Sequence, residues 1–285
     1  MTLQQSQAGQ VSTHRHAGGG CLTHPIGRTA GRSGRQRMPD VREIARAAVA
    51  AGFQRHIRDT LLRDAPGFDD AWARASNIPG YFHEVNAAAF WSVIQERKPT
   101  TVVEIGSYQG RRTAVLGLAL QQHIGKGARL VAIDPHTGDR QALEALGLEV
   151  LPSLEMFRLH TSSIGISDLL DERVTTAVEA AVQWSGTVDL LFDDGWHSYD
   201  AVQEDAAAWL PQLAPDGLVC FDDYLHYDEV RRAVDEVCPR HGLKLYGTVL
   251  AQAWAGRQPE PPVGLARALA AGRLRSKIQA IGGHR

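Results

Sequence analysis

The fold is decided by one segment, Val102-Val103-Glu104-Ile105-Gly106-Ser107-Tyr108-Gln109-Gly110. An apolar strand ends at an acid, a turn with two glycines follows, and a helical run begins directly after Gly110. Glycines at such a turn let the backbone bend sharply and approach a ligand without a Cβ in the way. A dinucleotide-binding turn would read Gly-x-Gly-x-x-Gly. A Glu-x-Gly-x-x-x-Gly turn instead favours a cationic ligand with an amino group, because the carboxylate of Glu104 would repel a pyrophosphate.

Short apolar strands alternate with helices beyond this turn, which is typical of a mostly parallel sheet covered on both faces. The sequence predicts strands at Thr101–Ile105, Arg129–Ile133, Val174–Val178, Val188–Phe192 and Leu218–Phe221. It predicts the intervening helices at Arg111–His123, Pro152–Leu159, Ser198–Leu210 and Tyr227–Cys238. Two closely joined strands, Lys244–Val249 and Ala251–Ala255, indicate an antiparallel pair at the sheet edge.

The regions outside the predicted sheet differ from it in composition. Residues 1–38 contain no Asp or Glu and little apolar periodicity, so we expect a disordered or non-native extension. Residues 39–98 form a helical region, with helices predicted from Asp40 to Phe53, Gln54 to Arg63 and Glu84 to Glu96. Residues 99–256 carry the sheet, and residues 257–285 form a tail with a short exposed helix. The N-terminal helices are candidates for substrate selection and for a homodimer contact.

Composition excludes several classes of protein. The chain has 30 Lys and Arg against 32 Asp and Glu, which argues against a nucleic-acid surface. No stretch approaches the roughly 18 apolar residues that a membrane span needs. The 3 cysteines share no metal-binding spacing, which fits a reducing cytoplasm.

A second acid follows the second predicted strand. Asp134 ends the run Leu130–Ile133 and is placed to accept hydrogen bonds from ribose hydroxyls. An acid after strand one, glycines next, and an acid after strand two together favour a nucleoside ligand. His136 is predicted to be an adenosine-side or structural contact.

Residues from about 78 to 255 resemble class I S-adenosylmethionine (SAM)-dependent methyltransferases, and among them the metal-dependent O-methyltransferases that act on macrolide and aminocoumarin sugars. The matching segments are Val103–Gly110, Ala132–His136, Asp189–Tyr199 and Phe221–Tyr224. The resemblance implies an α/β fold, a Rossmann-like doubly wound seven-stranded sheet with an antiparallel edge hairpin. It implies that the methionine moiety is held by Glu104, Gly106, Ser107, Tyr108 and Gly110. It also implies that Asp134 binds the ribose and that Glu179 and Ala180 meet the adenine.

Carboxylates also end two later strands. Asp193-Asp194-Gly195 follows one strand and Asp222-Asp223 the next. Carboxylates brought together at one sheet edge need a compensating cation, and Mg²⁺ or another divalent cation with oxygen ligands is the simplest one. The resemblance implies that Asp194, Asp222 and Asp223 are the ligands. The alternative is that Asp222 and Asp223 only cap the turn that follows them.

The residue types around these acids suggest how methyl transfer would run. A metal chelated by neighbouring hydroxyls would orient an acceptor and lower its pKa, and a general base would complete the transfer. Many relatives carry a second Asp where this chain has Trp196, so His197 is the first candidate for the base and His226 the second. Trp196 and Tyr199 are expected to form an apolar wall.

The predicted function is therefore transfer of a methyl group from SAM to a saccharide hydroxyl. The acceptor would be an antibiotic sugar, or a mannoside or other sugar of an actinobacterial glycolipid or polysaccharide. A catechol-type or other small-molecule O-methyltransferase stays open, although such enzymes typically read Asp-Asn at the second site. Two other classes also stay open, an NAD(P)-dependent Rossmann enzyme and a non-catalytic SAM-binding protein.

Overall fold

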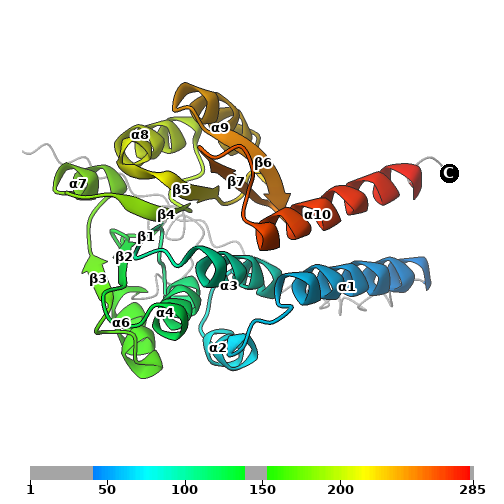
Figure 1. Cartoon of the computed structure of the whole chain (residues 1–285), viewed down its shortest axis with the longest axis horizontal. Coiled ribbons are helices and arrows are strands. Elements are labelled where there is room, and N and C mark those ends of the chain that lie inside the picture. Colours follow the sequence, from blue (N-terminus) through cyan, green and yellow to red (C-terminus); the bar gives the residue numbers. More distant parts are fainter. Residues whose placement is uncertain (1–40, 139–152, 283–285) are drawn as a thin grey trace, which may run out of the picture. The chain divides into compact units, whose positions relative to one another are not determined.

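The computed structural model describes residues 41–138 and 153–282, and its centre is a seven-stranded sheet of order β3-β2-β1-β4-β5-β7-β6. Neighbouring strands from β3 to β5 are parallel, whereas β7 is antiparallel to both β5 and β6. Figure 1 shows this sheet with helices on both sides. The predicted Rossmann-like, mostly parallel sheet with an antiparallel edge hairpin is confirmed. The extension at residues 1–38 and the helix cap at Asp40 lie outside the described residues.

The strands are β1 (Thr101–Ile105), β2 (Arg129–Ile133), β3 (Leu170–Arg173), β4 (Val188–Asp193), β5 (Leu213–Phe221), β6 (Lys244–Val249) and β7 (Gln252–Gly256). The helices that precede the sheet or lie between its first strands are α1 (Val41–Leu61), α2 (Phe68–Ala75), α3 (Glu84–Arg97), α4 (Arg111–His123) and α6 (Ser153–Ile164). The later helices are α7 (Ala177–Val182), α8 (Tyr199–Trp209), the 3-10 turn η1 (Leu210–Gln212), α9 (Asp228–Arg240) and α10 (Val263–Gly282).

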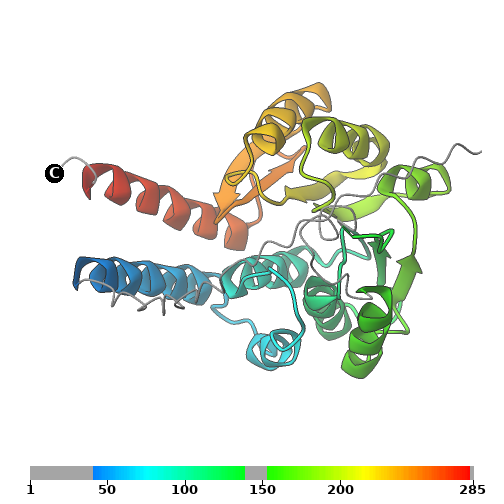
Figure 2. The same ribbon diagram turned by 180° about the vertical axis from the view of Figure 1, so that it is seen from behind.

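Alternate residues of the strands feed two separate hydrophobic cores. Val102 of β1 belongs to the core formed with α2, α3, α4 and α10, whereas Val103 belongs to the core formed with α7, α8 and α9. This alternation follows from the two-residue period of a strand, which sends successive side chains to opposite faces. The two opposite views in Figures 1 and 2 both show α7, α8 and α9 grouped along one side of the sheet.

The third strand is the main error of the sequence prediction. The β-branched run Val174–Val178 was predicted as a strand, but β3 is Leu170–Arg173 and Val178 lies in α7. The Thr176 side chain accepts from the Glu179 amide while the Glu179 carboxylate accepts from the Thr176 amide, a capping box that starts a helix at this point. The strand itself is charged. Asp171 of β3 forms an ion pair with Arg129 of β2. Because the strand is polar, hydrophobic periodicity does not predict it.

Two helical predictions also need correction. The predicted break between residues 53 and 54 is absent, since α1 runs continuously from Val41 to Leu61. The tail helix α10 is not merely exposed: Leu265, Ala268 and Leu269 are buried in the core shared with α3. Its first amides, at Val263 and Gly264, donate to the two carboxylate oxygens of Glu96 on α3, which fixes its start.

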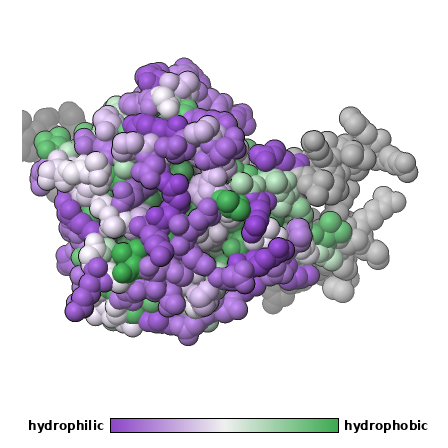
Figure 3. Space-filling view, in the orientation of Figure 1, coloured by the Kyte–Doolittle hydropathy of each residue, from purple (hydrophilic) through white to green (hydrophobic). Residues whose placement is uncertain are grey.

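Among the residues that the structure describes, no helix combines the length and the apolar composition that crossing a membrane requires. The face shown in Figure 3 is largely hydrophilic, with its hydrophobic side chains in small separate groups.

Phe90 of α3 should be a principal contributor to stability. It is fully buried, and its ring centroid lies 4.6 Å from that of Trp254 and 5.1 Å from that of Phe192. We predict that Phe90→Ala lowers the free energy of unfolding in urea by about 3–5 kcal/mol. The matched control is Val182→Ala in α7, whose side chain is 82% exposed, and it should change stability by less than about 0.5 kcal/mol. Equal effects of the two substitutions would contradict this view of the core.

Candidate functional site

The site lies where the strand order reverses. The chain passes from β1 outward through β2 to β3, then returns to the other side of β1 with β4 and β5. Loops leaving the carboxyl ends of such strands diverge and open a crevice. A cavity of about 1670 Å³ is found there, lined by residues of the loops after β1, β2, β3, β4 and β5 and by residues of α1 and α3.

The glycine turn after β1 forms one wall of this cavity. Gly106 has φ of 81°, and a Cβ there would lie 1.9 Å from the carbonyl oxygen of Asp194, so no other residue fits. Gly110, with φ of 91°, caps the start of α4. Between them Ser107 is buried and lines the cavity, and its hydroxyl has no hydrogen-bond partner among the described residues. A buried hydroxyl without a partner is costly, which indicates a ligand at this wall.

Asp134 lies beside this turn, as predicted. One of its carboxylate oxygens accepts from the Tyr108 amide at 2.8 Å and the other from the His136 amide at 2.7 Å. A carboxylate has about four acceptor sites, so it can still accept from two ligand hydroxyls. His136 does not line the cavity; its ring packs near Phe157, and its Nδ1 lies 3.2 Å from the Ser153 hydroxyl. These contacts are compatible with the structural role predicted for His136, and its adenosine-side role stays a prediction.

Glu104 is not among the residues that line the cavity. Its side chain is fully buried, and one oxygen accepts from Arg112 Nε at 2.8 Å and the other from the Thr113 hydroxyl at 2.6 Å. Burial raises the pKa of Glu104, and the charge of Arg112 opposes that rise. Both carboxylate oxygens of Glu104 thus accept from side chains of α4, and its predicted contact with the cofactor stays a prediction.

Arg112 is the site residue that sequence reasoning missed. Besides Glu104, its guanidinium donates to Asp194 Oδ2 at 2.8 Å and to the carbonyl oxygen of Gly106 at 2.5 Å, and it lies 3.8 Å above the Phe192 ring. Burial disfavours its charge, but Asp194, Glu104 and Asp222 keep the pKa of Arg112 above its usual value. The available signal was an arginine within the otherwise apolar face of Arg111–His123, eight residues after a strand-ending acid.

Glu179 and Ala180 lie in a helix and not after a strand, and their predicted contact with the adenine stays a prediction. Both lie inside α7 and neither lines the cavity, because the third strand ends earlier than predicted. The carboxylate of Glu179 is engaged by Thr175 and Thr176 in the helix cap. The residues that line the cavity after β3 are instead Thr176, Ala177 and Val178.

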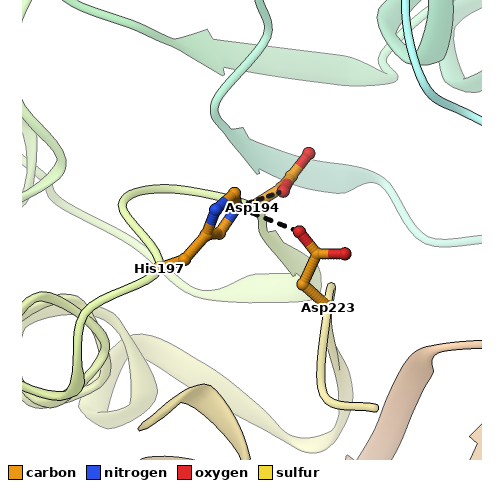
Figure 4. Close-up of side chains that lie close together, drawn as sticks. All are labelled: Asp194, His197 and Asp223. Carbon is orange, nitrogen blue, oxygen red and sulfur yellow. Dashed lines mark hydrogen bonds and ion pairs between the residues drawn. The ribbon is translucent and has the colours of Figure 1, made fainter. Parts of the chain in front are cut away.

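Two of the predicted metal ligands lie together, and a histidine joins them. Asp194, His197 and Asp223 each offer a ligand atom within 4.8 Å of the others. Figure 4 shows the three side chains close together. His197 Nε2 lies 3.1 Å from Asp223 Oδ2 and 3.5 Å from Asp194 Oδ1. The hydrogen bond to Asp194 raises the pKa of His197.

Asp222 is not part of this group. Its Oδ1 accepts from the Asp223 amide at 2.8 Å, which is the turn-capping role considered as the alternative. Its Oδ2 lies 3.8 Å from Arg112 Nη1. Burial, and then the charge of Asp194, raise the pKa of Asp222 to about 6.

The remaining predicted residues divide between the cavity and its surroundings. His226 lines the cavity, and its Nδ1 lies 2.7 Å from Asp223 Oδ1. Trp196 lines it as well and is 59% exposed. Tyr199 does not form an apolar wall there, since its hydroxyl donates to Glu236 of α9 at 2.5 Å.

Residues 103–224 match a family model described as "Methyltransferase domain". This match, together with the Rossmann-like sheet, confirms the predicted enzyme class at the level of a methyltransferase. No curated protein sequence matches the chain significantly.

Solved structures share the fold at low sequence identity. The SAH-bound methyltransferase PaMTH1 of Podospora anserina is 14% identical, with a TM-score of 0.52 over 78% of this chain and 98% of that one. The cofactor-bound Rv0187 from MTB is 16% identical, with a TM-score of 0.51 over 77% and 97%. The O-methyltransferase NovP is 19% identical, with a TM-score of 0.50 over 63% and 83%.

Replacing Arg112 tests how much the stability of the protein depends on the charge of its guanidinium group. We predict that Arg112→Met lowers the free energy of unfolding by about 3–5 kcal/mol, because Glu104 would remain buried without its partner. The double variant Glu104→Gln/Arg112→Met should recover most of that loss, since it removes the fully buried charge that has lost its partner, while Asp194 and Asp222 are partly exposed. Arg158→Met, which removes an exposed pair with Glu172, is the control and should cost about 1 kcal/mol or less. A double variant as unstable as Arg112→Met would contradict the assignment.

Proposed function

We propose that this protein is a SAM-dependent O-methyltransferase that uses a divalent cation and methylates a saccharide hydroxyl. The observation that carries the proposal is the arrangement within one cavity of a methyltransferase domain. A glycine turn and Asp134 form one part of its wall, and Asp194, His197 and Asp223 form another. The first part suits a nucleoside cofactor, and the second suits a cation and the acceptor.

The cofactor half of the cavity fits SAM, which supplies an electrophilic methyl group. The unpartnered Ser107 hydroxyl and the backbone at Gly106 and Tyr108 would meet the methionine moiety. Asp134 would accept from the ribose hydroxyls, and Thr176, Ala177 and Val178 would border the adenine. An NAD(P)-dependent enzyme is disfavoured, because this turn lacks the Gly-x-Gly-x-x-Gly pattern that admits a pyrophosphate.

The donor set at the ends of β4 and β5 fits a divalent cation. Asp194 Oδ1 and Asp223 Oδ2 both face His197, while Arg112 occupies only Oδ2 of Asp194. A cation held there supplies positive charge that lowers the pKa of an adjacent acceptor hydroxyl. The presence of this donor set disfavours a protein that binds SAM without catalysis.

The geometry favours His226 over His197 as the general base. Asp223 Oδ1 lies 2.7 Å from His226 Nδ1, which fixes the ring and leaves Nε2 to accept a proton. His197 is less suitable, because its Nε2 faces the carboxylates of Asp194 and Asp223. The order of the two candidates from the sequence is therefore reversed in this proposal.

The acceptor half of the cavity combines an apolar wall with a buried amide. Register places Ala251 next to the Asp222–Asp223 end of β5, since β5 and β7 pair Phe221 with Ala253. Phe82 and Ala251 line the cavity together with Asn86, which is 7% exposed and whose Oδ1 has no partner among the described residues. An apolar surface with one unsatisfied acceptor suits a sugar ring whose hydroxyl donates to Asn86.

The proposal leaves one alternative within the class, a catechol-type or other small-molecule acceptor. The exposed Trp196 at the cavity could stack on a flat aromatic ring as well as on a sugar face. The buried acceptor atom of Asn86 favours a polyol. The homodimer and the cytoplasmic setting expected from the sequence stay predictions.

Removing divalent ions should abolish methyl transfer. Labelled SAM is offered with a panel of mono- and disaccharides, methylated mannosides included, and with catechols. We predict transfer to a saccharide, complete loss of transfer in EDTA, and recovery when a divalent ion is added. S-adenosylhomocysteine should still bind in EDTA at micromolar concentration, which shows that the protein remains folded. Full transfer in chelator would contradict the proposed metal dependence. Binding of NAD(P) in place of S-adenosylhomocysteine would contradict the proposed methyltransferase class.

Replacing His226 should slow turnover without weakening cofactor binding. With the acceptor found in that panel, we predict that His226→Ala lowers kcat by about 100-fold or more, because the proton of the acceptor hydroxyl loses its base. The affinity for S-adenosylhomocysteine should stay unchanged. His241→Ala, at the end of α9 and outside the cavity lining, should behave like the parent protein. Unchanged kcat in His226→Ala would rule out this base.

A further inference from the structure

We propose that Asp194, His197 and Asp223 form a mixed site of two carboxylates and one imidazole, which selects a first-row transition ion such as Co²⁺, Fe²⁺ or Zn²⁺ over Mg²⁺. The inference rests on the proposed metal-dependent function and names the ion class for that site. It replaces the all-oxygen set of Asp194, Asp222 and Asp223 expected from the sequence.

The position of the His197 ring supports its role as a ligand. Its Nε2 lies 3.1 Å from Asp223 Oδ2 and 3.5 Å from Asp194 Oδ1. The ring stacks on Tyr227, with centroids 4.7 Å apart and planes 20° apart, so its orientation is set from the opposite side. Figure 4 shows the imidazole and the two carboxylates pointing toward one another from the ends of β4 and β5.

Asp222 is held away from this group by two other contacts. Its Oδ1 is used by the Asp223 amide and its Oδ2 faces Arg112. Arg112 also occupies Oδ2 of Asp194 at 2.8 Å, which leaves Oδ1 as the oxygen turned toward His197. The described residues therefore bring two carboxylate oxygens and one imidazole nitrogen together, and not three carboxylates.

The donor atoms determine which ion such a site prefers. Mg²⁺ demands near-octahedral oxygen coordination and gives up water reluctantly. An imidazole nitrogen instead suits Zn²⁺, Fe²⁺, Co²⁺ and Ni²⁺, and affinities for a nitrogen-containing site rise along the first transition row. One nitrogen ligand in place of one oxygen ligand thus raises the affinity of the site for transition ions relative to its affinity for Mg²⁺.

The test compares ion affinities in the full-length protein with S-adenosylhomocysteine bound. Calorimetric titration of the parent protein should give a Co²⁺ affinity at least about 100-fold above that for Mg²⁺. His197→Asp restores an all-oxygen set, so it should reduce this ratio by about tenfold or more through weaker Co²⁺ and tighter Mg²⁺ binding. Spin-echo spectra of bound Mn²⁺ should show modulation from an imidazole nitrogen in the parent protein and none in His197→Asp.

Asp222→Asn provides the matched control, because it removes a carboxylate from the same strand end but outside the donor set. It should keep the parent ratio and the nitrogen modulation. An unchanged ratio in His197→Asp, or a ratio that collapses in Asp222→Asn, overturns the inference and leaves metal-dependent methyl transfer standing. If neither ion binds while S-adenosylhomocysteine does, both this inference and the metal dependence fail, and the methyltransferase class stands. Unchanged S-adenosylhomocysteine affinity shows that each variant is folded.

Discussion

The buried guanidinium of Arg112 is the interaction on which the rest of the site depends. An arginine cannot lose its proton, so a 6% exposed one needs acceptors on every side. It finds Glu104 from β1, the carbonyl of Gly106 from the cofactor turn and Asp194 from the end of β4. One planar group thereby fixes three separate pieces of backbone, and its planar fork does this with directions that a lysine could not reproduce.

The contacts of Arg112 also limit which carboxylates could act as ligands of the proposed cation. Both carboxylate oxygens of Glu104 accept hydrogen bonds, one from Arg112 and one from Thr113. One oxygen of Asp222 accepts from the Asp223 amide, and the other lies near Arg112. Asp193 is buried beside Asp205, and burial raises its pKa well above the usual range, which suits a structural acid rather than a ligand. Asp194 Oδ1 and Asp223 are the acceptors that remain on the side of His197. The proposed ligand set would thus follow from the contacts that the buried arginine makes with the other acids.

Much of the fold, and part of the site, could be predicted from the sequence. Apolar strands that end in acids reveal both the parallel sheet and the edge at which those acids meet, because parallel strands share one carboxyl end. Asp134, the pair Asp193-Asp194 and the pair Asp222-Asp223 were predicted at strand ends in this way, and the choice of Asp194 over Asp193 came from the family resemblance. The charged strand β3 was not predicted, because an edge strand held by ion pairs carries no hydrophobic pattern. The partner of Glu104 could not be deduced either, since its contact with Arg112 depends on how α4 packs over β1.

The two halves of the cavity are joined through backbone as well as through Arg112. Gly106 approaches the carbonyl of Asp194 so closely that a Cβ would lie 1.9 Å from it. The turn that would hold the methyl donor therefore cannot shift without moving the strand end that would hold the cation and acceptor. Methyl transfer requires donor and acceptor in line, and a small misplacement costs much of the rate. Packing the two loops against each other, with one guanidinium bridging them, gives that alignment a rigid basis before any ligand binds.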